Sequence, residues 1–345
     1  MNLDIAHLMR PGTLNLPALP ALSVYVHLPW CLKKCPYCDF NSHEWRGSSG
    51  SHASDPSSLP ESLYLDALRA DLEASLPLVW GRPVHSIFIG GGTPSLFSPE
   101  GIGRLVSDLR ARLPLVPDCE ITLEANPGTF EKERFHAFRA AGVTRLSVGV
   151  QSFNDTHLRA LGRVHNAAQA HAAVLEASQA FETFNIDLMY ALPGQSMSAL
   201  SHDVAQALSF KPPHLSIYHL TIEPNTLFAK HTPAGLPEDD DAYDMLDTIT
   251  AQTALHAWSD TRYPPLRKAG TAVGTTPTIG NLVITWAWAR VPTASCLLPI
   301  GCCALCGIAN PSCTWTRPWV RVRWHKAMRC LGPNSRLNSC STRCA

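Results

Sequence analysis

Six short apolar runs follow one another along the first two thirds of the chain. Most of them are continuously hydrophobic rather than alternating, which is the pattern of parallel strands that are buried on both faces. We therefore predict strands at 22–28, 84–90, 120–125, 145–150, 184–190 and 214–220.

Helical patterns fill the segments between these runs. Leu65, Leu68, Leu72 and Leu76 recur at spacings of three and four residues, which marks one face of a helix. The run Ser98-Pro-Glu places a capping residue before a proline at the first helical position. Further helices are predicted at 132–141, 167–181 and 198–209. Strand alternating with helix six times predicts an α/β fold with a parallel sheet, two units short of a closed eight-stranded barrel.

Composition changes abruptly near residue 260. The chain has 28 acidic and 28 basic residues, so its zero formal charge does not indicate a nucleic-acid partner. All acidic residues lie at or before Asp260, whereas the last 85 residues contain 11 Lys or Arg. An ordinary domain would hold several carboxylates there, because charged residues make up about a quarter of a typical chain. We predict an N-terminal extension (1–21), a core (22–257) and an atypical Cys-, Trp- and Arg-rich tail (258–345).

Neither a signal peptide nor a transmembrane segment is predicted. The N-terminus lacks a cationic start followed by an apolar stretch, and no uninterrupted apolar run reaches 18 residues. We therefore expect a cytoplasmic protein. In that compartment thiols stay reduced, and clustered cysteines bind metal more often than they pair.

Three cysteines follow the first predicted strand with the spacing C-x3-C-x2-C. Cys31, Cys35 and Cys38 supply three thiolates, whereas a structural zinc site takes four ligands. The spacing alone leaves two interpretations open. One is half of a zinc site whose fourth ligand lies elsewhere, and the other is a cubane iron–sulfur cluster with one open iron that binds a small molecule.

Other polar groups occupy the same end of later strands. Gly90-Gly-Gly-Thr-Pro94 follows the second strand, Glu124 ends the third, Gln151 follows the fourth and Asp187 lies in the second half of the fifth. Barrels of parallel strands hold their reacting groups at this carboxyl end. Because a buried carboxylate is costly without a partner, packing alone does not explain the arrangement.

A cysteine motif after a first strand, followed by a strand–helix series, resembles the radical S-adenosylmethionine (SAM) enzymes. More narrowly, the segment 22–257 is similar to the branch that contains oxygen-independent coproporphyrinogen III dehydrogenases and HemW-type heme chaperones. The resemblance implies an open partial (β/α)6 TIM-type barrel. It also implies a 4Fe-4S cluster held by Cys31, Cys35 and Cys38, with SAM bound at the fourth iron.

The resemblance further implies which residues contact SAM. They are Tyr25, Tyr37, Gly91, Gly92, Thr93, Glu124, Gln151, Arg163 and Asp187. Backbone groups of the glycine run would meet the methionine part, since glycine allows a close approach, and the polar side chains would bind the ribose and the charged methionine end. Local patterns leave other roles open: a plain turn for the glycines, a solvated helix end for Arg163, a structural carboxylate for Asp187 and core packing for the tyrosines.

One position separates the two branches. The dehydrogenases resemble C-x3-C-x2-C-x-C, whereas this chain has Phe40 in place of the additional cysteine. The continuation Asp-Phe-Asn-Ser-His and the runs at 192–196 and 218–226 are similar to the heme chaperones. Heme is then implied as cargo, with heme-acceptor proteins such as respiratory enzymes and an electron donor for the cluster as partners. The competing hypotheses are a coproporphyrinogen III dehydrogenase and a zinc-binding module.

The tail departs from the resemblance. The chaperones carry a segment like His-Asn-x-x-Tyr-Trp, associated with heme handling, and then a small helical domain, and neither follows residue 257 here. We hypothesise a shifted reading frame that begins near His256 or Ala257 and that removes the heme step from this copy. Cys303 and Cys306 form a C-x2-C pair, but in a segment without acids or clear periodicity we interpret it as chance.

Overall fold

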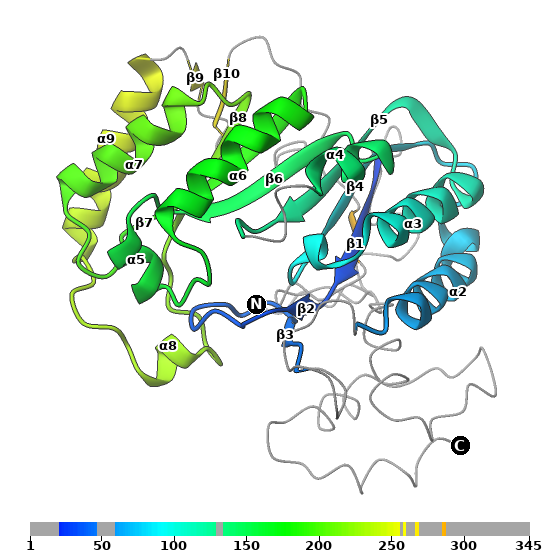
Figure 1. Cartoon of the computed structure of the whole chain (residues 1–345), viewed down its shortest axis with the longest axis horizontal. Coiled ribbons are helices and arrows are strands. Elements are labelled where there is room, and N and C mark those ends of the chain that lie inside the picture. The colour runs from blue at the N-terminus through cyan, green and yellow to red at the C-terminus, as the bar shows by residue number, and fades with distance from the viewer. Residues whose placement is uncertain are drawn as a thin grey trace, which may run out of the picture.

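A curved sheet of six parallel strands in sequence order forms the centre of the molecule (Figure 1). The computed structural model describes residues 21–46, 59–128, 134–255, 258–259, 266–268 and 285–287. The six strands are β1 (Leu22–Leu28), β4 (Val84–Gly91), β5 (Leu115–Ala125), β6 (Arg145–Gln151), β7 (Thr183–Tyr190) and β8 (His214–His219). The predicted α/β fold with an open partial (β/α)6 barrel is therefore confirmed.

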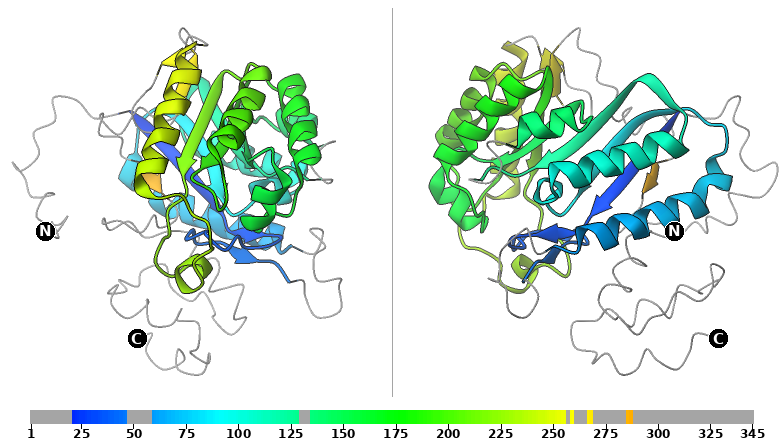
Figure 2. Two further views of the ribbon diagram at one scale, coloured as in Figure 1. Left: turned by 90° about the vertical axis from the view of Figure 1, so that its left-hand side faces the viewer. Right: turned by 45° about the vertical axis from the view of Figure 1, so that its right-hand side comes forward.

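Helices follow the strands and cover the outer face of the sheet (Figure 2). Parallel neighbours require such crossover connections. The helices are α2 (Glu61–Val79), η2 (Pro94–Leu96), α3 (Pro99–Arg112), α4 (Phe135–Ala140), α5 (Asp155–Ala160), α6 (Ala167–Ala180), α7 (Met197–Ser209), α8 (Leu227–Lys230) and α9 (Asp239–Leu255). In the described ranges, no helix combines the length and the apolar character that a bilayer crossing requires.

Local sequence signals fix the helix starts. The Ser98 hydroxyl accepts a hydrogen bond from the Gly101 N–H at 2.9 Å, so α3 begins at the predicted cap. At α6, Asn166 and Gln169 exchange side-chain and backbone hydrogen bonds in a capping box. Each cap satisfies N–H groups that the first helical turn leaves without partners.

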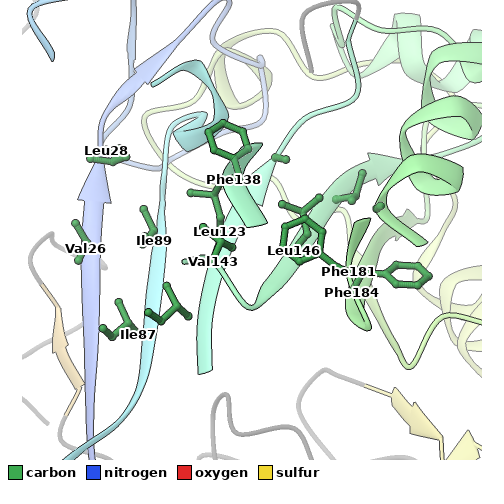
Figure 3. Packing of buried hydrophobic residues seen from close by; sticks show 14 of the residues in the cluster. Val26, Leu28, Ile87, Ile89, Leu123, Phe138, Val143, Leu146, Phe181 and Phe184 are labelled. Carbon is green, nitrogen blue, oxygen red and sulfur yellow. The ribbon is translucent and has the colours of Figure 1, made fainter. Parts of the chain in front are cut away.

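The apolar runs become the core between sheet and helices. Figure 3 shows Ile87, Leu123 and Leu146 on three successive strands, with Phe138 of α4 next to Leu123. All four side chains are fully buried. The apolar positions of the strand sequences thus reflect burial in the core.

Some elements differ from the prediction. Helix α9 was not predicted, because its first turn holds three aspartates and its buried face consists of little more than Met245 and Ile249. The short helices α5 and α8 were also missed. Strand β5 begins five residues before the predicted start at 120. The predicted helix at 132–141 appears as α4, and positions 132 and 133 lie outside the described residues.

Three short strands from beyond residue 257 extend the sheet. Strand β11 (Thr285–Ala287) runs parallel beside β1, while β10 (Leu266–Lys268) runs antiparallel beside β8 and pairs with β9 (Trp258–Ser259). The rest of the predicted tail and the N-terminal extension lie outside the described residues. The predicted domain boundaries therefore stay predictions.

Candidate functional site

A cavity of about 570 Å³ opens at the carboxyl ends of the strands. Its walls come from the loop that carries the three cysteines, the glycine run after β4 and the ends of β5 to β8. Eleven of the twelve residues predicted for the site line this cavity, and Tyr25 is the exception. The fold thus brings together side chains from five separate strand ends, as expected for a parallel barrel.

The loop with the three cysteines is closed at its base and braced inside. Its flanks form β2 (Trp30–Cys31) and β3 (His43–Glu44), which pair with each other. The Lys34 ammonium donates hydrogen bonds to the carbonyls of Phe40 (2.9 Å) and Ser42 (3.1 Å). This bracing holds the three unpaired thiols on one short loop that faces the cavity.

Burial controls the protonation of these thiols. It raises the pKa of Cys31 to about 11 and also raises the pKa of Cys38. Both thiols are protonated at neutral pH, so they become ligands when a metal displaces the proton. In the part of the chain that the structure describes, no three His, Cys, Asp or Glu side chains are arranged to hold one metal ion.

The glycine run is built into the base of this loop. Three backbone N–H groups donate to protein acceptors: Gly91 to the Glu124 carboxylate (3.1 Å), Gly92 to the Leu28 carbonyl (2.8 Å) and Thr93 to the Trp30 carbonyl (2.8 Å). These three N–H groups are therefore satisfied within the protein, and the predicted contact of the run with SAM stays a prediction. A plain solvent-exposed turn would not make such bonds.

Steric limits explain why glycine occupies positions 91 and 92. Gly91 has φ of +119°, and a Cβ there would overlap the His27 ring. A Cβ on Gly92 would lie 2.6 Å from the Trp30 carbonyl oxygen. The backbone approach that joins the glycine run to the cysteine loop is thus possible only without side chains.

Two half-buried carboxylates, Glu124 and Asp187, lie on the cavity wall. Burial, with a further contribution from the Asp187 charge, raises the pKa of Glu124 to about 7. Burial also raises the pKa of Asp187, against hydrogen bonds from Ser147 Oγ (2.9 Å) and Asn185 Nδ2 (2.7 Å). Two carboxyl groups that face the same small cavity favour a ligand with a positive charge or with several hydroxyl groups.

Arg163 is half-buried at the cavity and is not a solvated helix end. Its guanidinium donates to the Gly149 carbonyl (2.8 Å), the Asn126 side-chain oxygen and the Cys35 sulfur (3.6 Å). Within the described residues its Nε is buried and has no hydrogen-bond partner. The guanidinium therefore lies directly beside a thiol of the cysteine loop.

The two tyrosines take different places. Tyr37 lines the cavity, and its ring centroid lies 6.3 Å from that of Phe228. Tyr25 stacks on Phe88 beside the cavity, and its hydroxyl lies 3.2 Å from His27 Nδ1. His27 Nε2 in turn donates to the Asn41 carbonyl at 2.8 Å. Tyr25 thus supports the cysteine loop through His27.

Sequence reasoning missed a polar floor beneath the cavity. The Arg145 guanidinium lies 2.7 Å from His214 Nδ1. This histidine nitrogen also lies 2.7 Å from Asn185 Oδ1. These side chains, with Ser147 and Ser216, alternate with apolar residues along β6, β7 and β8. The sequence signal for this floor was the polar residue at every second position of these three strands, on the face that lines the cavity. Treating the strands as continuously apolar hid it.

Comparison with known proteins identifies the family. A sequence profile of the Radical SAM superfamily matches residues 25–207, just over half of the chain. The chain belongs to the radical SAM superfamily. The matched range contains every residue predicted for the site, from Tyr25 to Asp187.

Several relatives within the superfamily carry the name heme chaperone HemW. The chain is 48% identical to the one from Haemophilus influenzae over 237 residues, which cover 67% of this chain and 59% of that protein. It is also 48% identical to the one from Escherichia coli over 230 residues, which cover 66% of this chain and 58% of that protein. The chain thus matches less than two thirds of the length of these relatives.

A solved radical SAM structure has a similar fold. The coproporphyrinogen III oxidase HemN from Escherichia coli superposes with a TM-score of 0.63 and 28% sequence identity, over 73% of this chain and 56% of that chain. The superfamily implies a 4Fe-4S cluster and SAM. The residues present fit these groups, because three free thiols, a cation at Cys35 and two half-buried carboxylates face one cavity.

Proposed function

We propose that the chain holds a 4Fe-4S cluster through Cys31, Cys35 and Cys38 and binds SAM in the adjoining cavity. The observation that carries this proposal is the convergence of the three thiols, Arg163 and two half-buried carboxylates on one cavity of about 570 Å³. Four elements far apart in sequence contribute these groups. Packing requirements alone would place apolar side chains there.

Five side chains of the cavity have a defined physical role in this proposal. Glu124 and Asp187 bind the hydroxyl and ammonium groups of SAM by accepting hydrogen bonds. Arg163 stabilises negative charge on the Cys35 sulfur, and Gln151 offers an amide to the ligand. Tyr37 closes the wall with its ring and excludes water. The reduced cluster, when bound, supplies one-electron chemistry towards the sulfonium of SAM.

The proposed biological role is that of a cytoplasmic heme chaperone, which binds heme and passes it to acceptor proteins such as respiratory enzymes. The names of the two HemW relatives support it, since 66% or more of this chain matches them. Phe40 at the position of an additional cysteine argues against the alternative, a coproporphyrinogen III dehydrogenase. An electron donor for the cluster is a further expected partner. The atypical tail leads us to expect weakened or lost heme transfer in this copy.

Anaerobic reconstitution with iron and sulfide tests the cofactor proposal. We expect four irons and four sulfides per chain and a spin-resonance signal of the reduced cluster that changes on addition of SAM. Cys38→Ser should lose the cluster, whereas Cys119→Ser should keep it, because Cys119 is a buried free thiol on β5. Zinc without iron or sulfide after anaerobic purification would instead establish the zinc-binding module.

Heme titration and a coproporphyrinogen assay separate the two functions. Heme binding without formation of protoporphyrinogen supports the chaperone role. Formation of protoporphyrinogen from coproporphyrinogen would overturn it. Repeating the titration on a version with a HemW-like C-terminal region measures what the tail has removed.

A further inference from the structure

The loop between β6 and α5 carries a site residue in an unusual conformation. Gln151 ends β6 with φ of +68°, a left-handed conformation that costs a non-glycine residue about 1–2 kcal/mol. The register between β6 and β7 also shifts between Gly149 and Gln151. Such a conformation persists only where the surrounding structure fixes it.

A buried aspartate on α7 provides that fixation. The Asp203 carboxylate accepts hydrogen bonds from the Ser152 hydroxyl (2.6 Å) and the Phe153 N–H (2.8 Å), the two residues directly after Gln151. Asp203 is 1% exposed and Ser152 is fully buried. Because a buried donor that loses its acceptor is costly, these two bonds hold the loop firmly against α7.

The same anchor extends into α5. Ser152 Oγ accepts from the Asn154 N–H at 3.0 Å, and the Asn154 side chain caps α5 by accepting from the Thr156 N–H at 2.8 Å. Just beyond α5, the Arg163 N–H donates to the Leu158 carbonyl at 2.9 Å. The conformation of Arg163 therefore depends on where this short helix lies.

We propose that Asp203 is a positioning residue for the cofactor cavity, because it sets the conformation of Gln151 and, through α5, the approach of Arg163 to Cys35. This inference rests on the proposed binding of SAM. Asp203 itself does not line the cavity. A carboxylate on α7 is otherwise unexplained, since an apolar side chain would be buried there at lower cost.

Three single variants of the full chain test the proposal after anaerobic cluster reconstitution. Asp203→Ala removes both acceptors, and Asp203→Asn keeps a carbonyl oxygen for the Phe153 N–H. Glu176→Ala is the matched control, because Glu176 is another buried carboxylate on an outer helix, α6. For each variant we would measure the SAM dissociation constant, the iron content and the thermal midpoint.

Asp203→Ala should weaken SAM binding about tenfold at unchanged iron content, as expected for loss of a charged hydrogen-bond acceptor. Asp203→Asn should bind within about threefold of the wild type, and Glu176→Ala within about twofold even if it lowers the thermal midpoint. Equal SAM affinity of Asp203→Ala and wild type would overturn the positioning role. So would an equally large loss in Glu176→Ala, because general loosening would then explain both.

A wild-type chain that loads the cluster but binds no SAM would instead refute the proposed function. If Asp203→Ala does not fold, Ser152→Ala supplies the test, since it removes the 2.6 Å bond to Asp203 and the acceptor of the Asn154 N–H, and leaves the bond from the Phe153 N–H to Asp203 in place. We expect about threefold weaker SAM binding from this variant. Unchanged affinity in Ser152→Ala would overturn the proposal.

Discussion

Replacing Gly92 by alanine should displace the cysteine loop. The new Cβ would lie 2.6 Å from the Trp30 carbonyl oxygen and 2.7 Å from the Pro29 carbonyl carbon, well inside ordinary contact distance. Overpacking of this kind costs about 1–3 kcal/mol. Because both neighbours are backbone atoms that cannot rotate away, we expect the upper end, about 3 kcal/mol or roughly a hundredfold in the folding equilibrium.

The assay is urea unfolding of the cluster-free protein, followed by iron and sulfide analysis of the reconstituted protein. Cys31 directly follows Trp30, so the same displacement should lower cluster content. Gly103→Ala is the control, since its Cβ meets nothing closer than 3.6 Å and alanine favours the helix by about 1 kcal/mol. The reasoning would be wrong if Gly92→Ala were as stable as the wild type and took up a full cluster.

Three other predictions concern the carboxylates, the arginine and the tail. Because burial raises the pKa of Glu124 to about 7, the folded carboxyl keeps a proton that the unfolded chain loses above its ordinary pKa of 4.5. The contribution of Glu124 to the free energy of unfolding therefore falls as the pH rises from 4.5 to 7, by up to about 3 kcal/mol. Glu124→Gln should reduce the difference in stability between pH 5 and pH 8, measured by urea unfolding. An unchanged difference would contradict the raised pKa of Glu124. Arg163→Lys should weaken SAM binding about tenfold in calorimetric titration. A single ammonium group cannot replace the planar guanidinium, which donates hydrogen bonds to Asn126, Gly149 and Cys35. Equal affinity of the variant and the wild type would rule out a role of Arg163 in SAM binding. Resequencing the gene around His256 should reveal an inserted or deleted base, and an intact frame with the same tail in close relatives would exclude the frame hypothesis.

The sheet could be predicted from the sequence because each strand carries a run rich in buried apolar residues, although polar residues alternate with them along β6, β7 and β8. The predicted and observed bounds of β1 coincide at 22–28, and the other five strands differ mainly at their ends. Helix α9 gave no comparable signal, since its exposed face mixes three aspartates of the first turn with Tyr243 and Leu246. A helix that buries so few side chains has too weak a periodicity to be recognised.

The site was only partly accessible to sequence reasoning. The cysteine spacing and the carboxylates at strand ends are local features, and they pointed to one rim of the barrel. The position of Arg163 depends on the turn at Gly162, whose φ of +68° directs the chain back towards Cys35. The partnership of Asp203 with Ser152 joins residues 51 positions apart. Neither arrangement leaves a local pattern, so only the tertiary structure reveals them.

The edges of the barrel bear on how the tail is interpreted. An open six-stranded sheet exposes backbone N–H and C=O groups along β1 and β8, and such edges attract any extended segment. Strands β11 and β10 occupy these two edges through backbone pairing. Backbone hydrogen bonds require no particular side chains, so this pairing is equally compatible with a native tail and with a frame-shifted one. By contrast, no residue described beyond Glu223 lines the cavity. Among the described residues, the cavity is thus built by the part of the chain that precedes the change in composition, and a frame shifted near residue 257 would leave those residues unchanged.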